Sequence, residues 1–217
     1  MYSLGQELEE DLKWREAELA SLKLLLSDLG PGSTRRDGLL RALCALLYAH
    51  YEGFCKFAWD YYFDSLEKTR VSRRDCVDHI ARISLQKDFQ DMRKDLSPDA
   101  IWDFCTNRFP SLLQDRLTFN LKLETNANLW PNLLIENSAS VGLACSAARD
   151  HAVKLKSLVA RRNEIAHGQK MTISNLAEYQ EYEHAAVLVM HELAISVLEA
   201  LESKSHLLSF PISRKID

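Results

Sequence analysis

An arginine and a histidine lie five residues apart in the segment Arg161–Gly168, with an asparagine beside the arginine and a glycine directly after the histidine. The guanidinium of Arg162 is a permanent cation whose geometry matches phosphate oxygens. His167 can accept and donate protons near neutral pH. Together with Asn163, these residue types could cleave a phosphodiester bond without a metal ion.

The spacing alone is common, because Arg74 and His79 repeat it in a mixed segment that has no clear apolar stripe. Arg162 differs from Arg74 because helical periodicity places it on the apolar face of its predicted helix. A guanidinium on such a face is costly unless it is paired or lies at a seam. Two interpretations stay open: an ion pair with Glu52 or another carboxylate, or a cleft or subunit interface where Arg162 meets a phosphate.

His167 is expected at the C-terminus of the same helix, where Gly168 can end it and where the helix dipole favours the imidazolium form. Asn163 lies one turn earlier and could orient the ring. Arg162 and His167 point about 140° apart on an ideal helix. A helix-capping role for His167 and a catalytic role therefore both stay open, and a second copy of the chain could complete a site.

The elements that must hold these residues are predicted to be helices, because only 7 glycines and 5 prolines punctuate 217 residues. Leucines at helical spacing predict an N-terminal helix at about 5–29. A second helix at about 37–67 is apolar on nearly every side, as in the centre of a bundle. Residues 70–95 are expected to form a loop with shorter helical pieces.

A further helix is expected to begin after Ser97, which can cap a first turn that contains Pro98. Pro110 is expected to limit this helix. A turn at Thr125–Asn128 precedes a short helix, and two more helices follow at about 144–167 and 174–203. No strand pattern is evident. The sequence predicts one all-α, up-and-down helical bundle of five to seven helices in a single domain, residues 1–217.

Composition excludes several classes of function. The net charge is −4, so nucleic-acid contact would need a local basic patch. Five cysteines without a CxxC pair indicate free thiols. No secretory signal or membrane span is recognised, so a cytoplasmic location is expected. GxxxxGK, GxGxxG and HExxH motifs are missing, and neither a cofactor nor a metal is expected.

The Arg162, Asn163 and His167 pattern resembles the signature of the HEPN superfamily (higher eukaryotes and prokaryotes nucleotide-binding). Two further stretches, 46–54 in the second helix and 125–130 in the turn, resemble a bacterial branch associated with toxin and defence systems. The resemblance implies a metal-independent endoribonuclease that acts as a homodimer, with one composite cleft formed by two facing motifs. An antitoxin or other neutralising partner is possible in such a system.

By this resemblance, Arg162 would hold the scissile phosphate and His167 would act as general acid or base, oriented by Asn163. The products would carry a 2′,3′-cyclic phosphate and a 5′-hydroxyl. Some HEPN toxins have a tyrosine two residues after the histidine, where a partner nucleotidyltransferase modifies them. Gln169 occupies that position here, which argues against control by that route.

Two further residues are secondary site candidates. Glu52 is a carboxylate in a very apolar helix and needs a cationic partner, such as Arg41 or Arg162. Arg161 is expected to face solvent or an RNA backbone, and His50 is expected to be a core histidine. The alternative to a nuclease is a non-catalytic helical module that binds a nucleotide, RNA or a partner protein.

Overall fold

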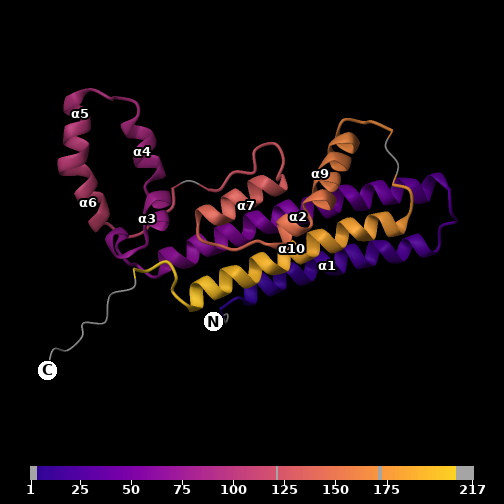
Figure 1. Cartoon of the computed structure of the whole chain (residues 1–217). Helices are drawn as coiled ribbons and strands as arrows, with labels where there is room; N and C mark the ends of the chain where they lie inside the picture. Colours follow the sequence, from indigo (N-terminus) through magenta and orange to yellow (C-terminus); the bar gives the residue numbers. More distant parts are fainter. Residues whose placement is uncertain (1–3, 121, 171–172, 209–217) are drawn as a thin grey trace. The chain divides into compact units, whose positions relative to one another are not determined.

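The described part of the chain is helical and contains no β-strand, which confirms the all-α class (Figure 1). The computed structural model describes residues 4–120, 122–170 and 173–208. Helical segments in these ranges are more numerous than the five to seven expected. The difference arises because short helices form where the sequence suggested mainly loop.

The chain divides into two compact units. The first unit comprises the residues up to Tyr61 together with Leu123–Leu198, and the second comprises Tyr62–Lys122 together with the residues that follow Leu198. All candidate site residues lie in the first unit. The expectation of a single domain over residues 1–217 stays a prediction.

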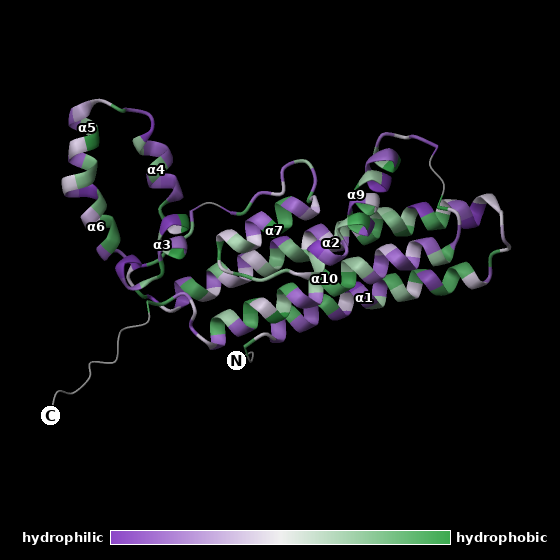
Figure 2. Cartoon of the chain, viewed as in Figure 1, coloured by the Kyte–Doolittle hydropathy of each residue, from purple (hydrophilic) through white to green (hydrophobic). Residues whose placement is uncertain are grey.

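Three long helices build the first unit: α1 (Gln6–Ser27), α2 (Thr34–Lys68) and α10 (Leu176–Glu202). They lie side by side, and hydrophobic residues recur along α2 and α10 (Figures 1 and 2). The link between α1 and α2 is short, as is typical of antiparallel neighbours. Lys23 of α1 pairs with Glu183 of α10 at 2.7 Å, so the contact between these two helices includes an ion pair.

The centre of α2 is buried, as its apolar sequence predicts. Trp59 is 1% exposed, and its indole Nε1 donates a hydrogen bond to Ser138 Oγ, 3.3 Å away in α7 (Pro131–Ser140). His50 is also buried, which confirms the interpretation of a core histidine. The side of α2 that carries Tyr48 and Glu52 faces the candidate site.

The helix expected at about 144–167 is interrupted. His151, with φ −103° and ψ 16°, separates α8 (Ala147–Asp150) from α9 (Ala152–Ala166). Glu192 of α10 accepts hydrogen bonds from the backbone nitrogens of Ser146 and Ala147, so these N-terminal amides of α8 have a carboxylate partner. This arrangement makes a separate helix start at α8 favourable.

The second unit is built from short helical segments. They are a 3₁₀ turn at Arg73–Asp75, α3 (Asp78–Ser84), α4 (Gln86–Met92), α5 (Pro98–Asp103), a π-helical segment at Phe104–Arg108 and α6 (Phe109–Gln114). Buried Arg73 joins them by donating hydrogen bonds to Ser84 Oγ, Leu112 O and Thr118 Oγ1 at 2.8–3.0 Å. A single buried side chain thus links several of these short elements.

The start of α5 is as expected, because Ser97 Oγ accepts a hydrogen bond from the Ala100 nitrogen. The expectation that Pro110 limits this helix is wrong. The helical path continues through a π-helical segment, and Pro110 sits in the first turn of α6. A proline is tolerated there because first-turn amides have no intrahelical acceptor.

All five cysteines are free thiols, and Cys105 is the exposed one. Burial raises the pKa of Cys44 and of Cys145 to about 12. These buried thiols are therefore unreactive at neutral pH.

Helix α10 is long and apolar enough to cross a membrane by length and composition, and half of its most apolar stretch is buried. A buried core helix meets the same test. The cytoplasmic location stays a prediction.

Stability is expected to fall when the pH drops from about 7.5 to about 5.5, and His206 contributes to this loss. Burial, reinforced by the charge of Lys204, lowers the pKa of His206 below its ordinary value. In the unfolded chain His206 takes up a proton near pH 6.5, whereas in the folded chain it does so only at lower pH. The contribution of His206 to the free energy of unfolding is therefore fully present above pH 6.5 and is lost below it. In urea unfolding at several pH values, His206→Phe should reduce this dependence, whereas the same change at exposed His184 serves as the control. An unchanged dependence in His206→Phe would contradict this assignment.

Candidate functional site

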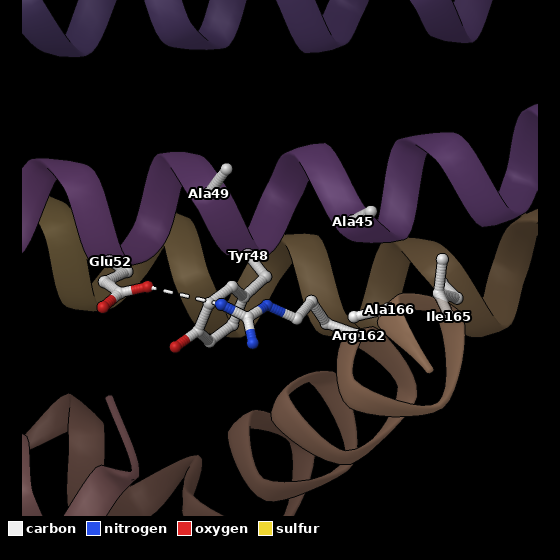
Figure 3. Close-up of a pocket in the computed structure, with 7 residues that line it drawn as sticks. All are labelled: Ala45, Tyr48, Ala49, Glu52, Arg162, Ile165 and Ala166. Carbon is white, nitrogen blue, oxygen red and sulfur yellow. Dashed lines mark ion pairs between the residues drawn. The ribbon is translucent and has the colours of Figure 1, made fainter. Parts of the chain in front are cut away.

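The candidate site lies where α9 crosses α2. Helix α2 presents Tyr48 and Glu52 one turn apart on the same side, and α9 places Arg162 against them (Figure 3). Arg162 lies on the inward side of α9 with Leu155, Leu158 and Val159, which are all buried. The apolar periodicity of α9 therefore directs the arginine inward.

Four groups hold the guanidinium of Arg162. Its carbon lies 4.2 Å from the centre of the Tyr48 ring, a cation–π contact. One terminal nitrogen donates hydrogen bonds to Asn128 Oδ1 at 2.8 Å and to Asn163 Oδ1 at 3.0 Å. The other lies 3.8 Å from Glu52 Oε2, and 27% of the arginine side chain stays exposed. The cation is thus held in place and still accessible.

Glu52 pairs with Arg162, one of the two arginines expected from the sequence, and also has other partners, whereas Arg41 donates instead to the Gln169 carbonyl at 3.2 Å. Its Oε1 accepts hydrogen bonds from Thr125 Oγ1 at 2.5 Å and from Lys56 Nζ at 2.9 Å. Burial raises the pKa of Glu52, but the hydrogen bonds from Thr125 and Lys56 outweigh it and hold the pKa below its ordinary value. The carboxylate is therefore ionised at neutral pH and supports the neighbouring cation.

The ring of Tyr48 contacts the guanidinium of Arg162, and its hydroxyl holds the turn before α7. Its hydroxyl accepts a hydrogen bond from the Leu129 nitrogen at 2.8 Å. Burial raises the pKa of Tyr48 to about 12, so the phenol stays neutral. Asn126 adopts a left-handed conformation, with φ of 51°, and the turn brings Asn128 to the arginine.

His167 lies at the C-terminal end of α9, as expected, and Gly168 follows it with φ of +70°. Its side chain is exposed and makes no hydrogen bond within the described ranges. The imidazole is therefore open to a ligand or to another chain.

The structure brings some of the candidate residues together and not others. Glu52 and Asn163 both contact Arg162. The Asn163 amide oxygen is engaged with the arginine rather than with His167. Arg161 points elsewhere, towards Glu178 of α10 at 3.4 Å.

A pocket of about 210 Å³ adjoins the guanidinium (Figure 3). Its lining combines one cation and one carboxylate with apolar walls from α2 and α9: Ala45, Tyr48, Ala49, Glu52, Arg162, Ile165 and Ala166. Such a lining suits an anionic group that carries an apolar neighbour. Among the described residues, no cluster of three or more His, Cys, Asp or Glu is placed to hold a metal ion.

Comparison with protein families decides the affiliation. A model of the MAE_28990-like HEPN family matches residues 4–206. The chain belongs to the HEPN superfamily. Searches of curated proteins and of solved structures found no significant match to this HEPN chain.

Three residues of this HEPN site were not identified as functional from the sequence: Tyr48, Thr125 and Asn128. All three lie in the two stretches that carry the resemblance to the bacterial HEPN branch. That resemblance marked the segments, but only the folded chain shows that they converge on one arginine.

Proposed function

We propose that this HEPN protein is a metal-independent endoribonuclease whose active site is completed by a second copy of the chain. The observation that carries the proposal is the guanidinium of Arg162, which is held by Tyr48, Glu52, Asn128 and Asn163 and yet stays partly exposed. A preorganised cation of this kind stabilises a phosphate whose charge grows in the transition state.

In the proposed reaction the ribose 2′-oxygen attacks phosphorus, and the bond between phosphorus and the 5′-oxygen breaks. The 2′-hydroxyl gives its proton to a base, and the leaving 5′-oxygen takes up a proton. His167 of one chain performs one of these transfers beside Arg162 of its partner, and solvent water exchanges the other proton. The products are a 2′,3′-cyclic phosphate and a 5′-hydroxyl, and RNA supplies both reacting oxygens.

A shared site is supported by the geometry of α9. Arg162 faces inward to α2, whereas exposed His167 lies about 140° around the helix. The exposed imidazole can therefore meet the arginine of a second chain. The resemblance of residues 46–54 and 125–130 to the bacterial branch supports, as part of this proposal, a role as a toxin or defence effector with a neutralising protein partner.

The first test is RNA cleavage by purified protein in excess EDTA, with analysis of the product ends. Cleavage that leaves cyclic phosphates supports the proposal, and strict dependence on added metal would contradict it. Binding of RNA or nucleotide without cleavage would favour the non-catalytic HEPN module.

His167→Ala is expected to abolish cleavage without loss of folding, because the side chain is exposed. Mixing this variant with Arg162→Ala should restore roughly a quarter of wild-type activity, since half of randomly paired dimers are mixed and each has one intact site of two. Activity can be measured after the two variants are unfolded and refolded together. Failure of the mixture to exceed the separate variants would exclude a site shared in this way.

A further inference from the structure

Helix α9 carries four basic residues, and their surroundings differ. Lys154 pairs with Glu181, Arg161 pairs with Glu178, and Arg162 is held at the candidate site. The fourth, Lys156, is exposed and makes no ion pair or hydrogen bond with any described residue. It is therefore the α9 cation whose charge no neighbouring carboxylate offsets.

Lys156 shares a helix face with two candidate site residues. At about 100° per residue, Lys156, Asn163 and His167 lie within about 40° of one another, with exposed Ala160 between them. Lys154 lies about 160° away from Lys156. No acidic residue of α9 falls on the face that joins Lys156 to His167.

The separation along the helix sets which phosphate Lys156 could reach. Eleven residues at about 1.5 Å each place its backbone roughly 16 Å from that of His167. Side chains that leave the helix this far apart are met more readily by different phosphates of one strand than by a single phosphate. Lys156 is thus suited to a phosphate some nucleotides away from the bond that is cut.

We propose that Lys156 binds a backbone phosphate of an RNA strand that runs along this face of α9. This contact rests on the proposed ribonuclease function and specifies its substrate as a strand of several nucleotides rather than a dinucleotide. Lys156 acts in binding and positioning and takes no part in the proton transfers. The contact depends on the charge and position of the phosphate and not on the identity of the base.

The binding test compares Lys156→Ala with Lys154→Ala, each in the His167→Ala background to prevent cleavage. A fluorescent single-stranded RNA of about twelve nucleotides is titrated at low and high salt. Loss of one phosphate contact should make the salt dependence shallower, so a fourfold rise in salt should weaken the parent's binding roughly threefold more than that of Lys156→Ala. Lys154→Ala, whose charge is already paired, should follow the parent. If RNA affinity fell equally steeply with salt concentration in all three proteins, the proposed contact would be contradicted.

The cleavage test uses substrates of two lengths with otherwise wild-type protein. Lys156→Ala should lower kcat/KM for the long RNA and leave dinucleotide cleavage unchanged, a split that general damage to the fold would not produce. Cleavage of both substrates that matches Lys154→Ala would overturn the inference and leave the ribonuclease proposal standing. RNA binding that depends on Lys156 without any cleavage would instead contradict the ribonuclease proposal alone.

Discussion

Arg162→Ala is expected to reduce RNA cleavage by about a thousandfold, the scale seen when a preorganised cation or donor at a reacting phosphate or oxyanion is removed. The folded chain should survive the change, because Glu52 keeps its hydrogen bonds to Thr125 and Lys56. Single-turnover cleavage at saturating protein measures the effect on the chemical step. Arg162→Lys should recover little activity, since one ammonium cannot reproduce the planar stack on Tyr48 with its paired hydrogen bonds.

The neighbouring arginine supplies a matched control. Arg161→Ala makes the same chemical change one residue away, but this side chain is tied to Glu178 and Glu164 on another side of the helix. It should retain cleavage within about threefold and lose little stability, as is usual for exposed ion pairs. Equal losses in both arginine variants would mean that general positive charge, and not the held guanidinium, supports activity.

Trp59→Ala is expected to lower the free energy of unfolding by about 3–5 kcal/mol, because it opens a large cavity at the centre of α2. Trp59 is 1% exposed and its indole nitrogen also hydrogen-bonds Ser138. Urea unfolding followed by circular dichroism measures the change. Trp59→Phe should fall between the wild type and the alanine variant, since it keeps most of the ring volume but leaves Ser138 without its donor.

The control for this substitution is Trp102→Ala, which removes an indole that is 72% exposed. Its effect should stay within about 0.5 kcal/mol, as for most surface changes. A loss at Trp102 comparable to that at Trp59 would show that the burial of the tryptophan does not determine the cost.

Helical periodicity was sufficient to predict the long elements and the side of α9 that faces inward. The spacing of leucines along 5–29 anticipated α1 closely, and the apolar face around Arg162 anticipated its contact with α2. The expected pairing of Glu52 with Arg162 is confirmed at 3.8 Å, whereas its pairing with Lys56 at 2.9 Å was not predicted. These features depend on local pattern and on the rule that a charge on an apolar face needs a partner.

Periodicity could not predict the contacts that complete the site, because they join residues that are far apart in the sequence. Tyr48 and Arg162 are separated by more than one hundred residues, and nothing in their local patterns pairs them. The carboxylate of Glu192 in α10, which accepts hydrogen bonds at the start of α8, was missed for a similar reason. In the second unit, buried Arg73 links several short elements, and its partners cannot be identified from spacing.

The turn at Thr125–Asn128 is fastened to α2 at two places, where Thr125 donates to Glu52 and the Leu129 nitrogen donates to Tyr48. The same turn delivers Asn128 to Arg162. Its attachment and the alignment of the arginine are therefore mechanically linked. A protein that bound this turn and displaced it from α2 would remove the Asn128 contact from the guanidinium. Such a protein could inhibit the site without covering the pocket.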